Sequence, residues 1–390
     1  MEASFHGALL GTLAGDVLGA PFEGESMAMV QQVMPDGPWS VADSRSFPNA
    51  VLAAVELGVD LGPSAVGEYT DDTEATFSLA ESIAACRGVH RRHAALSMAH
   101  WWARGARGGY SGYTFAKMAA LARGASVDET GAGTSAMPGG SYANGGAMRI
   151  APVGLAYAAC AQSVSIPRIG ESSGDPDALA RVVESLRQPV AAAIACTHTH
   201  PEAIDGAALL AAAVAQAVHV SADDVATLDG PTWFGALAAA STTEPLKTNM
   251  HTVAEALASV APDAPHPESV FVPTDKELLQ SWTDKWFQIR TSDAIPTVLY
   301  LIARYGVGPH AAPAETLVRA WIPDEWRATW ESDPRYGAPA AAPLAAALAS
   351  LACADDQPAL VVPDNDPHAT NISDALATEL AATELPTRFA

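Results

Sequence analysis

Apolar residues recur at intervals of three and four along most of the chain, which is the spacing of one face of an α-helix. This pattern predicts helices over residues 70–86, 91–104, 113–123, 146–162, 176–197, 202–219, 234–240, 251–260, 275–289 and 293–305. Alternating strand patterns are almost absent, and no repeat of fixed period is visible. The sequence therefore predicts an all-α protein that folds as a single compact multi-helix bundle over residues 1–336.

The last part of the chain has a different composition. From Gly337 onward alanine and proline dominate, as in the stretch APAAAPLAAALASLACADDQPALVVPDNDP. Biased segments of this kind have little apolar surface to bury and are poor candidates for a core. Residues 337–390 are therefore expected to form a partly disordered tail.

The charge balance narrows the classes of partner. The chain has 44 acidic residues against 21 lysines and arginines, for a formal net charge of -23. An electrostatic field of this sign repels nucleic acids and anionic membranes, so we expect neither as a direct partner. An anionic small ligand would need local help from a metal ion, backbone amides or a well-placed arginine. We expect the protein to be a monomer.

Cysteine usage and the N-terminus bear on localisation. Cys86, Cys160, Cys196 and Cys353 are isolated, without zinc-like spacing, and suit small apolar core positions in a reducing compartment. The first 24 residues lack a basic segment and carry Asp16 within their apolar stretch, unlike a signal peptide or a membrane span. We expect an intracellular protein that is cytoplasmic or nuclear, and an organelle matrix is also compatible.

Residues 69–74 read YTDDTE, with two adjacent carboxylates and no basic residue close in sequence to offset them. One interpretation is a helix cap, since Thr70 is a good N-cap residue and acids favour the first helical turn. The other is a site for a hard cation, since a hydroxyl and two carboxylates supply the oxygen ligands that Mg²⁺ or Ca²⁺ prefers. These residues alone do not choose between the two.

A second informative stretch is GGSYANGG at 139–146. Its glycines and its Asn-Gly pair permit positive φ, so that successive backbone N–H groups can turn inward and bind an anion such as a diphosphate. A helix predicted to start at 146 would add its N-terminal dipole. The alternative is an ordinary glycine-rich surface loop. Arg149 follows the loop, and two roles are open for it: contact with a phosphate or, as the favoured interpretation, an ion pair with a core carboxylate.

Two further positions carry chemistry that the sequence leaves open. THTH at 197–200 has the His-x-His spacing of some zinc sites, but its surroundings are helical and no third nitrogen or sulfur ligand is evident. A capping or ligand-contacting histidine is the favoured interpretation. Glu23 lies on a loop after the first helix and, taken alone, is typical of a surface residue.

In this order, these motifs resemble those of the ADP-ribosylglycohydrolase family, over about residues 5–336. GALLGTLAGDVLGAPFE is similar to the family's opening helix and acidic flap, and YTDDT to its first metal motif. GGSYANGGAMRI resembles its phosphate-binding loop, and TSDAIPTVLYLIARYG a late helix beside the adenosine. The resemblance looks closest to the branch that hydrolyses serine-linked ADP-ribose and poly(ADP-ribose). It implies an all-α bundle with a central metal cleft.

The resemblance also implies site residues. In the family two Mg²⁺ ions hold the distal ribose of ADP-ribose while the bond at C1″ is cleaved. Carried over by position, the metal ligands are Glu23, Thr70, Asp71 and Asp72, and the catalytic residues are Glu23 and Asp72. The substrate-binding residues implied are Asp71, Gly139, Gly140, Ser141, Tyr142, Ala143, Asn144, Gly145, His198 and Ile289, the last on the adenine side.

One departure from the family is clear. A second metal motif of the type GGDTDT, which starts another helix, is expected soon after the LYLIARYG segment, but no Asp-x-Asp occurs within 300–350. A loop and the helix after it are missing between Ala320 and Trp321, through a gene-model error, a splice variant or a true loss. At most one Mg²⁺ is then expected to be well held. Two hypotheses follow: a magnesium-dependent hydrolase of ADP-ribosylated protein, impaired in this chain, or a catalytically dead relative that binds ADP-ribose or is structural.

Overall fold

The computed structural model describes the following residues: 1–20, 69–105, 108–160, 166, 177–219, 228–259, 289–305, 338–351, 360–383 and 385. Within them are thirteen α-helices and one short 3-10 helix. The predictions for Glu23, for most of a helix at 275–289 and for the Ala320–Trp321 junction fall on residues outside this description.

The helices occupy these ranges: α1 (Glu2–Gly19), α4 (Asp71–Cys86), α5 (Arg91–Ala103), α6 (Gly112–Ala122), α7 (Val127–Gly131), η2 (Asn144–Gly146), α8 (Ala151–Cys160), α9 (Ala178–Ile194), α10 (Pro201–Ala217), α12 (Gly230–Ala240), α13 (Glu244–Ser259), α15 (Thr291–Tyr305), α18 (Ala338–Ala349) and α19 (Pro367–Ala382). In place of a sheet, the described residues contain two isolated β-bridges, Val89 with Val361 and Ala143 with Arg290. The prediction of an all-α fold is confirmed.

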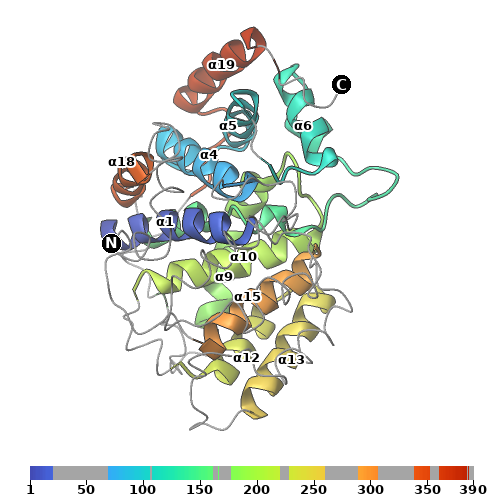
Figure 1. Ribbon diagram of the computed structural model, residues 1–390, viewed down its shortest axis with the longest axis vertical. Helices are drawn as coiled ribbons and strands as arrows, with labels where there is room; N and C mark the ends of the chain where they lie inside the picture. The colour runs from blue at the N-terminus through green and yellow to red at the C-terminus, as the bar shows by residue number, and fades with distance from the viewer. Residues whose placement is uncertain are drawn as a thin grey trace, which may run out of the picture.

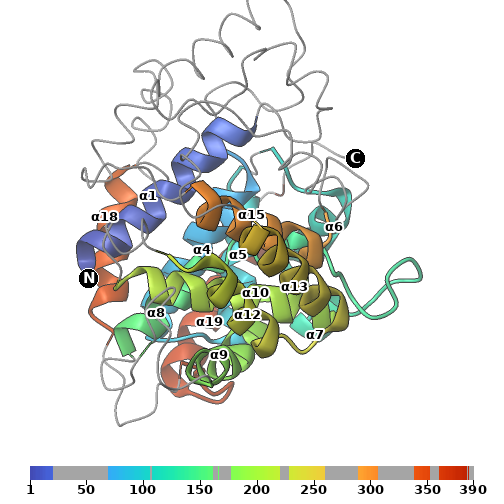
Figure 2. The same ribbon diagram turned by 90° about the horizontal axis from the view of Figure 1, so that it is seen from below.

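Helix α10 is at the centre of the bundle. It packs against α8, α9, α13 and α15, and its alanines at 203, 207, 208, 211 and 212 are completely buried. A helix that is apolar on all sides is expected in the interior, and its small side chains let neighbouring helices approach closely. Figures 1 and 2 show α9, α12, α13 and α15 around one part of α10, with α1, α4, α5 and α8 toward the other.

Most predicted helices are present, but α13 begins at Glu244 rather than at 251 and α12 at Gly230 rather than at 234. A third difference is informative for the site. The helix predicted at 146–162 begins only at Ala151, because residues 144–149 form η2 and a turn in which the Asn144 carbonyl accepts from the N–H groups of Ala147 and Met148. Pro152 suits the first turn of α8, where its missing N–H would have no helical partner. The turn places the glycine-rich loop ahead of α8.

The structure corrects the expectation that residues beyond 337 contribute little to the core. Helix α18 packs along α1 and buries Ala341, Ala345 and Leu348 completely. These residues recur at helical spacing and lie on the one side of this apolar, alanine-rich helix that packs against its neighbours. In Figure 1 α18 lies beside α1 and α4.

Helix α19 packs on α5 and buries Leu380 in a second hydrophobic cluster with Met98 and Trp102. Its start is capped by Asp366, whose Oδ1 accepts from the Ala369 N–H at 2.9 Å. The residues just before it pair with the α4–α5 turn, where Val89 donates to the Leu360 carbonyl at 2.6 Å. The second half of the tail is therefore also part of the packed structure.

The structure also shows the state of three of the cysteines. Cys86 and Cys196 are buried free thiols as expected, whereas Cys160 is disulfide-bonded, which differs from the expectation of four isolated thiols. Of the helices that the structure describes, none has the length and the hydropathy to cross a lipid bilayer.

Candidate functional site

Helix α4 begins at the paired aspartates, but its cap comes from another helix. Thr70 is the N-cap residue, yet its side chain makes no capping bond to its own helix. Asp16 of α1 takes that place: its Oδ2 accepts from the N–H groups of Thr70 at 2.9 Å and Thr73 at 3.0 Å. The same carboxylate accepts from both threonine hydroxyls, at 2.7 Å from Thr70 and 2.6 Å from Thr73. A carboxylate at a helix N-terminus is favoured both by the free N–H groups and by the helix dipole.

Thr70 and Asp72 bring oxygen atoms together at this helix start. Thr70 Oγ1 lies 3.4 Å from Asp72 Oδ2. Thr70 is almost completely buried, whereas Asp72 is half-buried. Two neighbouring ligands of an octahedral Mg²⁺, each 2.0–2.1 Å from the ion, lie about 3 Å apart, so this pair has the spacing and the chemistry of hard-cation ligands.

Asp71 contacts the segment at residues 108–110, which the sequence did not indicate as part of the site. Its backbone N–H donates to the Gly108 carbonyl at 3.0 Å, and Gly109, with φ of +95°, approaches so closely that an added Cβ would overlap Asp71 Oδ1. Next to it, the Tyr110 hydroxyl donates to Oε1 of the fully buried Glu74 at 2.9 Å. Burial, followed by the charges of Glu74 and Asp71, raises the pKa of Tyr110 well above its usual value.

The glycine-rich loop is held by the segment that precedes α15. Asn144 donates its N–H to the Ile289 carbonyl at 2.7 Å, and Thr291 donates its N–H to the Tyr142 carbonyl at 3.0 Å. The Thr291 hydroxyl lies within hydrogen-bonding distance of the carbonyls of Tyr142, at 2.9 Å, and Ala143, at 2.7 Å. This brings Ile289, whose side chain is exposed, against the loop.

Only part of the loop backbone is free to bind an anion. Gly140 alone among the loop glycines has positive φ, at +89°. The N–H groups of Gly140, Ala143 and Asn144 donate to the Met137 carbonyl, Ser141 Oγ and the Ile289 carbonyl. An anion nest in this loop would therefore use the amides of Gly139, Ser141, Tyr142 and Gly145, a smaller set than the glycine count suggests.

Polar and aromatic side chains border the loop on its exposed side. Tyr142 is 39% exposed, with its ring edge-on to His200 at 5.8 Å and the Arg290 guanidinium 5.4 Å from its centroid. Arg290 forms a bidentate pair with Glu202 at 2.7 and 2.5 Å, which lowers the pKa of Glu202. His200 is the N-cap of α10 and accepts from the Glu202 N–H at 3.2 Å. The expected capping histidine is thus His200.

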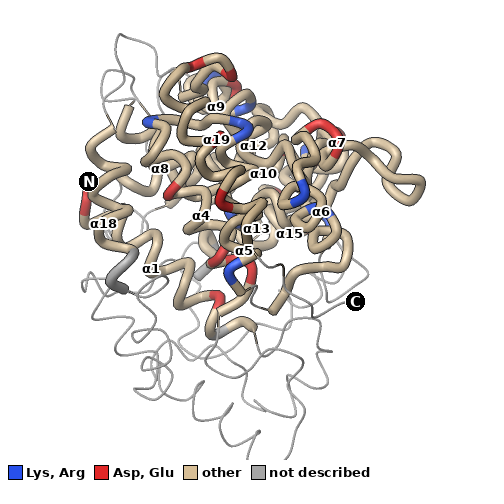
Figure 3. Tube along the Cα trace, turned by 90° about the horizontal axis from the view of Figure 1, so that it is seen from above, with Lys and Arg blue, Asp and Glu red and all other residues tan. Residues whose placement is uncertain are grey.

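Arg149 connects the two motifs. Its guanidinium is buried and donates to the Gly145 carbonyl at 2.5 Å and to Thr197 Oγ1 at 2.6 Å. Burial lowers its pKa, while nearby acidic groups, Asp71 among them, raise it. Asp71 therefore does have a cationic neighbour, brought from 78 positions away in sequence by the fold. Figure 3 shows acidic and basic positions of the trace close together near α5 and α1.

His198 lies beneath the same loop. Its Nδ1 is 2.8 Å from Thr197 Oγ1, and its side chain lies against the loop: a Cβ added at Gly145 would come within 3.0 Å of its ring and one at Gly146 within 3.2 Å of its Cβ. Burial, then the positive charges of Arg149 and Lys117, lowers the pKa of His198 well below its usual value. The imidazole is therefore neutral at physiological pH. Lys117, also buried, donates to the Thr197 carbonyl at 3.3 Å, and burial lowers its pKa to about 8.

The structure brings together most of the residues that the sequence nominated. Thr70, Asp71 and Asp72 share one helix start, and loop 139–145 meets His198 and Ile289. Glu23 lies outside the described residues. Within the residues described, no three histidine, cysteine or acidic side chains gather closely enough to hold a metal ion. What is present fits one side of a hard-cation site.

Sequence reasoning missed Asp16, Gly109 and Thr197. The sequence does contain one indication of Asp16: a carboxylate within an apolar helix needs hydrogen-bond partners if it is buried. Gly109 and Thr197 have none, because their importance depends on contacts with residues 38 and 48 positions away.

The sequence of the chain matches a known protein family. The model of the ADP-ribosylglycohydrolase family matches residues 1–362. The chain belongs to the ADP-ribosylglycohydrolase family. A protein of Archaeoglobus fulgidus, described only as uncharacterized, is 31% identical over 157 residues, or 40% of this chain and 44% of that protein. The match thus spans less than half the length of that relative.

A solved structure described as an ADP-ribosylglycohydrolase-related protein complex is also similar. It aligns with 90% of this chain and 98% of its own, at 22% identity and a TM-score of 0.42. The family assignment rests on the family model, and the all-α bundle is the architecture in which this member places its motifs.

Proposed function

We propose that this ADP-ribosylglycohydrolase is built as a magnesium-dependent hydrolase that removes ADP-ribose from modified protein side chains or from poly(ADP-ribose), and that its activity is impaired in this chain because the second metal motif is absent. The observation that carries the proposal is the position of Arg149. It donates to the Gly145 carbonyl of the loop and interacts electrostatically with Asp71 at the α4 start, so both motifs border one region. A ligand with a diphosphate at one end and a ribose at the other has the chemistry to use both.

Thr70, Asp71 and Asp72 are the residues that would hold magnesium, together with Glu23. All are oxygen donors, as this ion requires, and the spacing of Thr70 and Asp72 fits two positions of one coordination shell. When bound, the ion would supply positive charge that holds the ribose hydroxyls and offsets the charge of the ligand in a protein of net charge -23.

The chain's own residues would divide the remaining work. Free amides of the loop bind the diphosphate, and neutral His198 beside Gly145 contacts the ligand without adding charge. Asp72 orients a water molecule and accepts its proton as the water oxygen bonds to C1″. The bond from C1″ to the acceptor breaks, the acceptor takes up a proton, and free ADP-ribose leaves. Glu23 is proposed to assist protonation of the departing group.

A second candidate function has its own supporting observation. No Asp-x-Asp occurs in residues 300–350, where the family resemblance implies the other half of the metal site. A two-metal site needs acids on both sides to balance four positive charges. A chain with one half of the site is suited to bind ADP-ribose without cleaving it.

Release of ADP-ribose from serine-modified and arginine-modified protein separates the two functions. We expect little or no magnesium-dependent release by the 390-residue chain. Orientation and electrostatic stabilisation are each worth several kcal/mol of barrier, so losing part of both costs orders of magnitude in rate. Insertion of a GGDTDT-helix segment between Ala320 and Trp321 should restore release. If the insertion leaves the protein inactive but still able to bind ADP-ribose, the binding function stands and the hydrolase proposal fails.

A further inference from the structure

We infer that Asp16 is a positioning residue that turns the Thr70 hydroxyl into a cation ligand and fixes the start of α4 for that purpose. The inference rests on the proposed magnesium function, and it concerns a residue of α1 that lies 54 positions before Thr70. Asp16 does not touch the ion in this account. It acts through Thr70.

Two threonines donate to both oxygens of the Asp16 carboxylate. An ionised carboxylate has about four lone-pair sites. Asp16 accepts four bonds: from the N–H and hydroxyl of Thr70, at 2.9 and 2.7 Å, and from the N–H and hydroxyl of Thr73, at 3.0 and 2.6 Å. Three of these bonds end on Oδ2 and one, from the Thr70 hydroxyl, ends on Oδ1, so the carboxylate is a strong anchor for the backbone of residues 70–73.

The bond to the Thr70 hydroxyl sets the direction of its lone pairs. A hydroxyl has one hydrogen and two lone pairs. Its hydrogen is committed to Asp16 Oδ1 at 2.7 Å rather than to Asp72 Oδ2, which is 3.4 Å away. The lone pairs of Thr70 Oγ1 therefore face away from Asp16. The Thr70 hydroxyl then presents lone pairs beside the Asp72 carboxylate, and a cation would be stabilised by oxygens placed in this way.

An ordinary N-cap would make a different prediction. If Asp16 only capped α4, all of its hydrogen bonds would contribute to stability and none would affect the cation specifically. Thr73 separates the two roles. The Thr73 hydroxyl donates to Oδ2 of the same carboxylate. Its removal leaves the bond from the Thr70 hydroxyl to Oδ1 in place. Thr73→Val is thus a matched control for the loss of one bond to Asp16.

The experiment measures the rise in thermal unfolding temperature on addition of MgCl₂, with Mg²⁺ affinity from calorimetry, for the wild type, Asp16→Asn and Thr73→Val. A ligand that binds only the folded state raises stability according to its concentration relative to Kd. The wild type should be stabilised by Mg²⁺. Asp16→Asn is expected to lose this shift and to bind Mg²⁺ at least tenfold more weakly, whereas Thr73→Val should unfold earlier without Mg²⁺ but keep the shift.

The outcomes distinguish the inference from the proposed function. An unchanged Mg²⁺ shift in Asp16→Asn overturns the inference alone, as does an equal loss of the shift in Thr73→Val. If the wild type neither binds Mg²⁺ nor is stabilised by it, the proposed metal function fails and the inference falls with it.

Should Asp16→Asn fail to fold by circular dichroism, Asp16→Glu is the second variant. It keeps the charge but moves the oxygens by one methylene, and should bind Mg²⁺ at least tenfold more weakly. Wild-type affinity in that variant overturns the inference.

Discussion

Gly109 shows how strictly the site depends on single backbone positions. Its φ of +95° lies in the left-handed region that favours glycine, and the space where a Cβ would stand is occupied by Asp71 Oδ1 and the Thr70 side chain. Two separate requirements therefore meet at one residue: a backbone conformation that glycine adopts without strain, and the absence of a side chain where Asp71 Oδ1 lies.

Gly109→Ala should lower stability and weaken ligand binding at the same time. Gly124 supplies the matched control, since it has φ of +91° but no described atom within 4 Å of an added Cβ. We expect Gly124→Ala to cost about 1 kcal/mol in unfolding free energy from strain alone. Gly109→Ala should cost about 2–3 kcal/mol, because Asp71 must also move.

The measurement is urea denaturation of both variants, with calorimetric titration of Mg²⁺ and ADP-ribose. Binding should fall at least tenfold in Gly109→Ala and stay at the wild-type level in Gly124→Ala. Equal binding by the two variants would mean that the space beside Asp71 is not part of the site.

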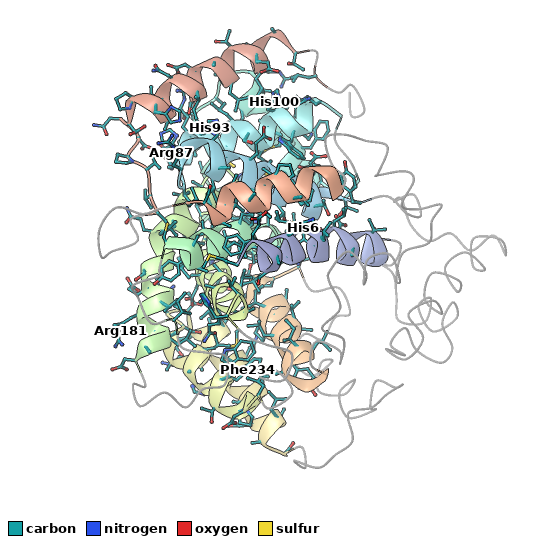
Figure 4. The ribbon with its side chains drawn as sticks, turned by 90° about the vertical axis from the view of Figure 1, so that its left-hand side faces the viewer. His6, Arg87, His93, His100, Arg181 and Phe234 are labelled. Atoms are coloured by element: carbon teal, nitrogen blue, oxygen red, sulfur yellow. The ribbon has the colours of Figure 1, made fainter. Side chains whose placement is uncertain are left out.

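At the scale of elements, the contact between α5 and α19 joins the tail to the bundle. Arg92 pairs with Asp374 at 2.6 Å, and His100 lies 3.8 Å from a Glu379 oxygen. Figure 4 shows His93 and His100 on α5, next to α19. Buried beneath this contact, His93 Nδ1 lies 2.9 Å from Ser82 Oγ of α4.

This contact predicts acid sensitivity through His93. Burial, then the charges of His90 and His368, lowers the pKa of His93 from 6.5 to about 4. A histidine with a depressed folded-state pKa takes up its proton more readily when unfolded. The stability it contributes is therefore complete above pH 6.5 and is lost as the pH falls toward 4. The loss through this one group is at most about 3 kcal/mol.

Comparison of unfolding free energies of the wild type and His93→Gln from pH 4 to 6.5 tests this. Titratable groups remote from His93 affect both proteins alike, so the difference between the curves reports on His93 together with its coupling to His90 and His368. The wild type should lose stability relative to the variant as the pH falls. Parallel curves would exclude His93 as the group responsible.

The sequence predicted elements better than it predicted their contacts. Helices such as 71–86 and 291–305 appear within two residues of their predicted starts, because apolar periodicity is local information. The cap on α4 was assigned to Thr70, but Asp16 supplies it, since a bond across 54 positions leaves no local trace. The burial of α18 was missed for a similar reason: its alanines form a face only against α1.

For the molecule as a whole, the question is how a protein of net charge -23 would hold a doubly charged diphosphate. The positive potential in the described site comes from backbone amides, from buried Arg149 and from Lys117, and the paired aspartates would add a metal ion to it. The proposed ADP-ribose site is therefore a local exception within an acidic surface. Its two halves are expected to depend on each other.

Calorimetric titration of ADP-ribose, with and without Mg²⁺, tests this central claim most directly. The wild type should bind more tightly with Mg²⁺ present. Asn144→Ala removes the side chain of the loop asparagine, and Gly145→Val places a side chain within 3.0 Å of the His198 ring. Each should reduce binding at least tenfold in the presence of Mg²⁺. Wild-type affinity in both variants, or affinity that is independent of Mg²⁺, would contradict the account.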